Sequence, residues 1–218
     1  MRFFQTVSLI LLIIISCSSV AAETTHDKTN KQVEKNLNWG IAVFGGQYSN
    51  DILVHDMLFN YGGWYPASTY GVSGSYAFGM DTGIGRFFNY IAAIPEVGLN
   101  VAYIYDQANP KPIYEFDSYF ELRWRKFPWD KYLLTSIAIG TGPSYVTRIP
   151  SNEARQVSNP NNVRHWLNSV MFEISLGLPK YPNFEIFYRL DHRSGVFGLM
   201  TPALIDSTAV TGGFRYRF

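Results

Sequence analysis

Alternation of apolar and polar side chains near the end of the chain is the sequence feature that most limits its fold. In the segment 183–194, the even positions from Phe184 to Leu190 are apolar, and the odd positions are mostly charged. The last five residues, 214–218, alternate in the same way between aromatic and arginine side chains. A period of two residues is that of a β-strand with one apolar and one polar face. The sequence therefore predicts two amphipathic strands here.

Six further segments have the same kind of pattern. The alternation that ends on Phe218 resembles the terminal strand of bacterial outer-membrane barrels. Eight strands are an even number, as in single-chain bacterial barrels. We therefore predict an all-β fold for residues 37–218, an eight-stranded antiparallel transmembrane β-barrel. The expected strands are 37–48, 69–80, 94–105, 114–125, 133–147, 164–178, 183–194 and 207–218.

The polar faces of these strands have large charged side chains of both signs, which bears on which face lies inside. In a soluble barrel such as a lipocalin the apolar face would point inward, whereas these charges can pair inside a narrow barrel. We expect the apolar face to contact lipid and the filled interior to leave no pore. The expected interior charges are Glu96, Glu115, Asp117, Glu121, Glu173, Glu185 and Asp191 with Arg123, Arg125, Arg189, Arg193, Arg215 and Arg217.

Connection lengths predict the orientation. Segments 49–68, 106–113, 148–163 and 195–206 are the expected long extracellular loops, and 127–130 and 179–182 the short periplasmic turns. Both termini would then be periplasmic. The connection 81–93 is long for a periplasmic turn, and we expect Phe87–Tyr90 to extend a strand.

The first 36 residues are expected to lie outside the barrel. Met1-Arg2, the apolar stretch 7–15 and Val20-Ala21-Ala22 form the three parts of a signal peptide, residues 1–22. A rival interpretation is a lipoprotein signal that ends at Cys17. Residues 23–36 are polar without periodicity, as in a disordered periplasmic lead. Cys17 is the one cysteine, so cleavage after residue 22 would leave no thiol chemistry.

The net charge of +1 argues against nucleic-acid binding. The histidines and acids do not show metal-ligand spacing, so we expect no metal and no cofactor.

His192 and Ser194 are polar residues at even positions, where the strand otherwise places apolar side chains. They would face outward near the extracellular end of the strand. Polar groups cost little free energy there, so a purely structural role remains open. His-x-Ser by itself is a weak pattern for catalysis.

The segment 188–195, on the penultimate strand of an eight-stranded barrel, resembles the lipid A 3-O-deacylase family of outer-membrane enzymes. The resemblance implies that His192 and Ser194 are catalytic and that Asp206, fourteen positions after the histidine, is the acid. It also implies that the backbone N–H groups of Gly195 and Val196 stabilise the oxyanion. The family usually has Glu at the acid position and Asn-Ala after the serine.

The resemblance implies an enzyme embedded in the bacterial outer membrane that binds lipid A of lipopolysaccharide, and it allows for a homodimer. Candidate contacts to the lipid A phosphates, which are otherwise solvated loop residues, are Lys111, Arg148, Arg155 and Arg164. Two alternatives remain: a non-catalytic barrel with a structural or loop-binding role, and another lipid-modifying barrel enzyme.

Overall fold

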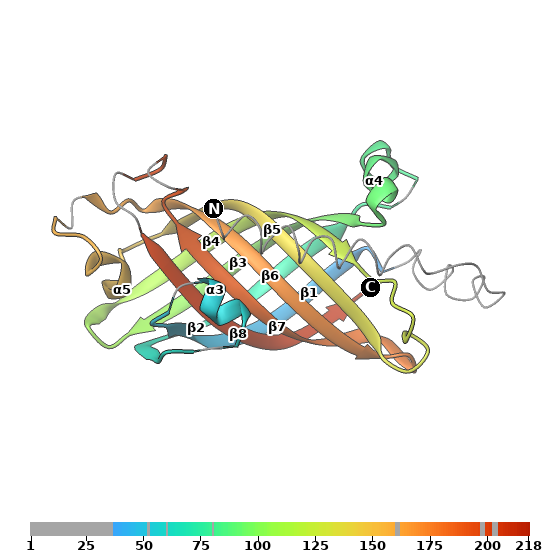
Figure 1. Ribbon diagram of the computed structural model, residues 1–218, viewed down its shortest axis with the longest axis horizontal. Coiled ribbons are helices and arrows are strands. Elements are labelled where there is room, and N and C mark those ends of the chain that lie inside the picture. The colour runs from blue at the N-terminus through green and yellow to red at the C-terminus, as the bar shows by residue number, and fades with distance from the viewer. Residues whose placement is uncertain are drawn as a thin grey trace.

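The protein is a closed antiparallel β-barrel in which each strand pairs with its neighbours in the chain and β1 pairs with β8 (Figure 1). The computed structural model describes residues 37–51, 53–59, 61–79, 81–159, 162–196, 199–201 and 205–218. The strands are β1 Trp39–Ser49, β2 Trp64–Ala77, β3 Ile94–Asp106, β4 Asn109–Trp124, β5 Leu134–Val146, β6 Trp166–Leu178, β7 Tyr181–Ser194 and β8 Asp206–Arg217. Short helices in the connections are α3 Leu53–Met57, α4 Gly83–Phe88, the 3₁₀ helix η1 Asn89–Ile91 and α5 Ser151–Ala154. The prediction of an eight-stranded antiparallel barrel is confirmed.

The predicted loop 106–113 is wrong, because β3 and β4 continue through it and leave only a two-residue turn. Asp106 stabilises this turn by accepting a hydrogen bond from the Ala108 N–H at 3.0 Å. Pro110 and Pro112 do not interrupt β4, since the register with β5 begins only at Glu115. Proline is tolerated where a strand has a free edge. The other three long loops are present, although β2 already begins at Trp64 and β8 at Asp206.

The expectation that Phe87–Tyr90 extends a strand is also wrong, because these residues lie in α4 and η1. Thr82 caps α4 by accepting a hydrogen bond from the Gly85 N–H at 3.0 Å. A side-chain cap of this kind satisfies an N–H that would otherwise lack a partner in the first turn. The local capping therefore starts a helix where alternation alone suggested more strand.

The interior is charged, as predicted, and its centre is the fully buried Glu173. Its carboxylate contacts Arg123 at 2.8 Å, Arg189 at 2.7 Å and Arg215 at 2.6 Å. Farther along the interior, Asp191 accepts hydrogen bonds from the Tyr119 and Thr211 hydroxyls. The interior is thus filled by ion pairs around Glu173 and by hydrogen bonds between polar groups around Asp191.

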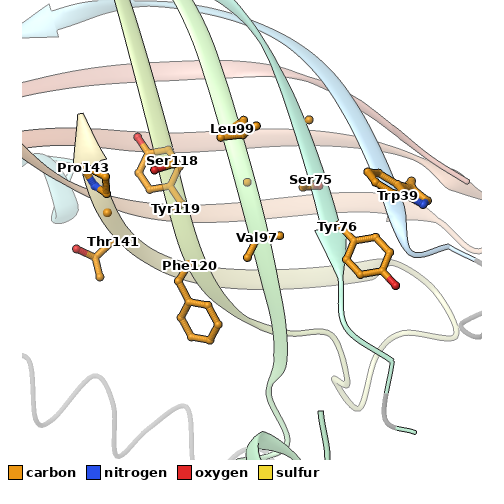
Figure 2. A pocket seen from close by; sticks show the side chains of 13 residues that line it. Trp39, Ser75, Tyr76, Val97, Leu99, Ser118, Tyr119, Phe120, Thr141 and Pro143 are labelled. Carbon is orange, nitrogen blue, oxygen red and sulfur yellow. The ribbon is translucent and has the colours of Figure 1, made fainter. Parts of the chain in front are cut away.

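The outer wall is apolar, which confirms the assignment of the two faces. Outward-facing Leu99 and Phe214 are 65% and 68% exposed, although both lie within long strands. A hollow of about 760 Å³ extends from Trp39 of β1 across to β5 on this wall (Figure 2). It forms where Gly74 and Ser118 are small beside Leu99 and Phe120. An apolar surface with such hollows suits contact with hydrocarbon chains.

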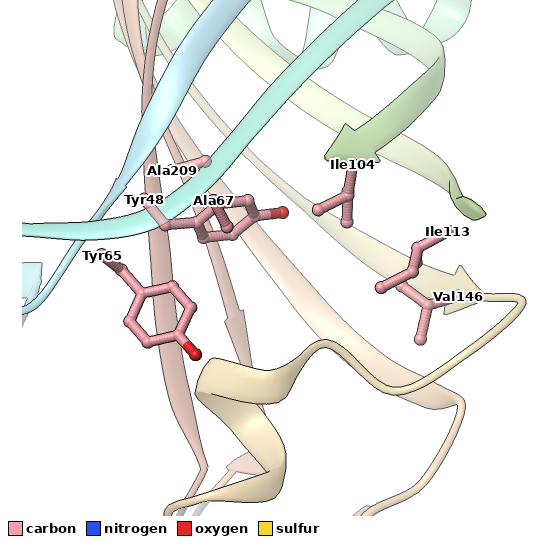
Figure 3. Packing of buried hydrophobic residues seen from close by; sticks show 7 residues of the cluster. All are labelled: Tyr48, Tyr65, Ala67, Ile104, Ile113, Val146 and Ala209. Atoms are coloured by element: carbon pink, nitrogen blue, oxygen red, sulfur yellow. The ribbon is translucent and has the colours of Figure 1, made fainter. Parts of the chain in front are cut away.

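Residues 147–159, which include α5, lie over one end of the barrel. Tyr48, Tyr65 and Ile104 belong to a buried apolar cluster inside this end, and α5 lies beside it (Figure 3). Glu153 of α5 is buried and contacts Arg193 of β7 at 2.9 Å. The mouth is therefore closed by both apolar packing and an ion pair.

The described residues of the connections β1–β2, β5–β6 and β7–β8 lie toward one end of the barrel, which we call the loop end (Figure 1). The described termini meet at the other end, where Trp39 and Phe218 exchange backbone hydrogen bonds of 2.9 Å. The signal-peptide, Cys17 and lead predictions lie outside the described residues. Within the described part of the chain, no helix is both long and apolar enough to cross a bilayer.

Candidate functional site

The candidate residues gather on the outer wall where β7 and β8 reach the loop end. His192 and Ser194 end β7, and the register places His192 opposite Thr208 and Ser194 opposite Asp206. Successive side chains of a strand alternate between faces, so all four side chains lie on the outer side. The antiparallel hairpin thus brings together residues that are fourteen positions apart in the sequence.

His192 is held through one ring nitrogen. Its Nδ1 lies 3.0 Å from the Thr208 hydroxyl and 3.3 Å from Asp206 Oδ1. Only the contact with Thr208 has the geometry of a hydrogen bond, and Asp206 Oδ1 has no hydrogen-bond partner among the described residues. A proton on Nδ1, directed to this side, leaves Nε2 as the basic nitrogen, which is the tautomer that a general base needs. The structure therefore brings His192 and Asp206 together.

Ser194 is not joined to His192 by a hydrogen bond within the described residues. Residues two apart on one strand face are roughly 7 Å apart at Cα, so the imidazole has to lean along the strand to reach the hydroxyl. The base His192 and the acid Asp206 are thus in contact, whereas the nucleophile Ser194 is not hydrogen-bonded to the base. Catalytic hydrogen bonds are often long in ligand-free enzymes.

The two backbone groups expected to bind the oxyanion differ. The Gly195 N–H points to the Ile205 carbonyl at 3.4 Å. Val196 has a φ of 50°, a left-handed conformation that is strained for a β-branched residue. Its N–H has no partner among the described residues, so of the two N–H groups only that of Val196 is not already used in a hydrogen bond.

The site is covered by the connection between β1 and β2. Leu190, His192 and Thr208 face outward but are only 3%, 8% and 0% exposed. The short helix α3 lies over β7 and β8 and contacts both (Figure 1). We call the described residues of this connection, 50–51, 53–59 and 61–63, the covering segment.

Side chains on either side of α3 fix the covering segment to the barrel. The Phe59 ring lies 5.4 Å from the Tyr188 ring, centre to centre, and the Tyr61 and Tyr188 hydroxyls are hydrogen-bonded. Asp56 of α3 accepts a hydrogen bond from the Ser49 hydroxyl at 2.7 Å. Burial raises the pKa of Asp56 above its ordinary value, and its carboxylate repels that of Asp206. The segment is thus held in place while it brings a second acid close to the site.

Three polar residues of the neighbourhood were not predicted. Thr208 is the nearer partner of His192, and Asn168 of β6 is paired in register with Ser194. The Gln156 amide binds the backbone of Asp206 twice, donating to its carbonyl at 2.6 Å and accepting from its N–H at 2.9 Å. Gln156 lies fifty residues before Asp206, so no local pattern could have identified it. Thr208, two positions after Asp206 on the same face, could have been found by strand parity.

The four candidate phosphate contacts lie at the loop end, and they differ in how they are held. Lys111 lies on β4, and Arg148, Arg155 and Arg164 lie in the connection 147–165. Arg155 stacks on the Tyr65 ring, with its guanidinium carbon 4.7 Å from the ring centre. Among the described residues no cluster of three or more His, Cys, Asp or Glu could hold a metal ion.

Comparisons with known proteins show the fold. No family model matches the sequence, and no curated protein matches it significantly. The chain is similar to the crystal structure of the outer membrane enzyme PagL, with a TM-score of 0.54 and 8% identity over 82% of this chain and 99% of PagL. It also matches the N-terminal β-barrel domain of Pseudomonas aeruginosa OprF, with a TM-score of 0.46 and 14% identity over 84% of this chain and 98% of that one. Neisserial surface protein A has a TM-score of 0.46 and 8% identity, covering 83% of this chain and 97% of its own.

The closed barrel, the apolar outer wall and the charged interior define the class of this protein: it is an eight-stranded outer-membrane β-barrel. A wall that exposes large apolar side chains along its strands is stable only in contact with lipid.

Proposed function

We propose that the protein is an outer-membrane esterase that removes an ester-linked 3-hydroxyacyl chain from lipid A. The observation that supports it best is the contact between His192 and Asp206 on the lipid-facing wall, beside Ser194. A polar trio of these residue types has an evident use at the edge of a membrane, where ester bonds of lipids are within reach. The similarity to the outer membrane enzyme PagL is in keeping with the proposal.

The reaction follows from the roles of the three residues. Ser194 Oγ attacks the ester carbonyl while His192 Nε2 accepts its proton, and Asp206 stabilises the imidazolium that forms. The Val196 N–H stabilises the negative oxygen. The proton then passes from His192 to the departing sugar oxygen, and water at the membrane surface hydrolyses the acyl-serine, which releases the fatty acid.

The direct test compares lipid A from bacteria with and without the protein by mass spectrometry. We expect producing cells to contain lipid A that has lost the mass of one 3-hydroxyacyl chain. A gain of an acyl chain would identify a transferase instead. Unchanged lipid A, from purified outer membranes and in detergent alike, would contradict the proposal.

The covering segment favours a second candidate, a barrel without catalytic activity, because it shields His192 from lipid. For an esterase, the substrate ester reaches His192 only when the covering segment moves. A variant that loosens the covering segment should increase the activity of an esterase, whereas a barrel without catalytic activity should release no fatty acid in either form.

Tyr61→Phe is expected to raise esterase activity by up to about fivefold, since one hydrogen bond contributes about 1 kcal/mol to the closed position. The substitution removes the hydroxyl that bonds to Tyr188. Tyr105→Phe, at an exposed position on β3, is the matched control. Initial rates of fatty-acid release measure both. A lower rate for Tyr61→Phe alone would show that the segment binds substrate instead of restricting access.

A further inference from the structure

A polar pocket of about 330 Å³ adjoins the candidate site at the loop end. Three parts of the chain meet there: the start of the covering segment with Asn50 and Asp51, the connection after α5 with Arg155 and Gln156, and the first residue of β8, Asp206. Asp206 connects the pocket with the site, because its carboxylate lies beside the His192 imidazole and its backbone binds Gln156. A molecule in this pocket would therefore lie directly beside the reacting groups.

Arg155 is the cation of this pocket, and its position suits an anion. Its guanidinium stacks on Tyr65, whose hydroxyl is hydrogen-bonded to Ser151 at 2.8 Å. Ser151 in turn donates to Asp106, which fixes the start of α5. No carboxylate within the described ranges forms a salt bridge with Arg155, so its charge is available. Stacking leaves the planar N–H groups of a guanidinium able to bind a phosphate at two points.

The remaining lining groups suit the hydroxyl and amide groups of a sugar. Asn50 contributes a side-chain amide, which can both donate and accept hydrogen bonds. Asp51 is held in place by His55, whose Nδ1 lies 2.8 Å from Asp51 Oδ1. The carboxylates of Asp51 and Asp206 would repel a phosphate placed against them, which confines an anion to the side of Arg155. A ligand with a phosphate at one end and sugar hydroxyls at the other fits this distribution of charge.

We propose that this pocket binds the phosphorylated sugar headgroup of a glycolipid, with Arg155 as the residue that contacts the phosphate. The inference rests on the proposed function, since a lipid whose ester lies at Ser194 has its headgroup at this end of the barrel. It also distinguishes among the four candidate cations. Arg155 lines the pocket, whereas Lys111, Arg148 and Arg164 do not.

The test measures binding, so that it does not depend on hydrolysis. The full-length protein with Ser194→Ala is placed in detergent micelles, and its Kd for bisphosphorylated lipid A is compared with that of the same protein carrying Arg155→Ala as well. We expect Arg155→Ala to weaken binding about tenfold, as for loss of a charge-assisted hydrogen bond. Arg148→Ala, which replaces an exposed arginine in the same connection, is the matched control and should change Kd less than about twofold.

A second ligand, lipid A without phosphates, shows whether Arg155 contributes to binding through the phosphate or through other contacts with the lipid. With lipid A from which both phosphates have been removed, the effect of Arg155→Ala on Kd should disappear, and Arg155→Lys should restore part of the affinity for the phosphorylated form. Equal effects of Arg155→Ala and Arg148→Ala would overturn the proposal, as would an effect of Arg155→Ala that persists without phosphates. Binding that depends on Arg155, by a protein that never hydrolyses lipid A, would support the pocket and contradict the esterase.

Discussion

Ser194→Ala is expected to slow ester hydrolysis by at least about three orders of magnitude, as loss of an attacking nucleophile does in serine hydrolases. The barrel should remain intact, because the Ser194 hydroxyl has no hydrogen-bond partner among the described residues and lies at the end of β7. Release of 3-hydroxy fatty acid from lipid A in detergent micelles measures the rate. To check that the Ser194→Ala barrel is folded, its resistance to unfolding in unheated detergent is compared with that of the unsubstituted protein. A Ser194→Ala protein that keeps most of its activity would exclude the proposed mechanism.

The same assay distinguishes the two partners of His192. If Asp206 supplies the negative charge, Asp206→Asn should lower the rate by a factor on the order of 10² to 10⁴, whereas Thr208→Val should have a much smaller effect. Both side chains lie within 3.3 Å of His192 Nδ1. A difference in rate between the two variants would therefore reflect the negative charge of Asp206 and not only its proximity to the imidazole. The reverse order of effects would assign the orienting role to Thr208.

Glu173→Gln is expected to destabilise the barrel by about 3–5 kcal/mol, the usual cost of breaking a buried ion pair by removing one partner. The glutamine has nearly the same shape, but it leaves Arg123, Arg189 and Arg215 without the carboxylate that contacts all three. Urea unfolding in detergent, followed by tryptophan fluorescence, measures the change.

Glu121→Gln is the matched control for this prediction. Glu121 is also buried, but its one salt bridge within the described residues is with Arg123 at 3.2 Å. We expect a clearly smaller loss of stability. Equal losses for the two variants would mean that the interior charges act as a diffuse network and that Glu173 is not its centre.

The sequence by itself determined the fold, because in a membrane barrel each strand has to place alternate residues in lipid and in the interior. That constraint leaves a period of two along nearly every strand, and the alternation at residues 183–194 is its clearest example. Parity also placed His192, Ser194 and Asp206 on one face, since the side-chain period fixes the face wherever the register is known. Parity could not identify the helix at residues 83–88, where the Thr82 cap decides the structure.

Only the tertiary structure decided the surroundings of the site. The packing of α3 on β7 and β8, the two hydrogen bonds between Gln156 and Asp206 and the stacking of Arg155 on Tyr65 all join segments that are distant in the chain. Loop residues of this kind follow no period, because their positions depend on where the barrel brings the connections together. The strand pattern could thus fix the wall on which the candidate trio lies, whereas the packing of loops on that wall determines whether lipid reaches it.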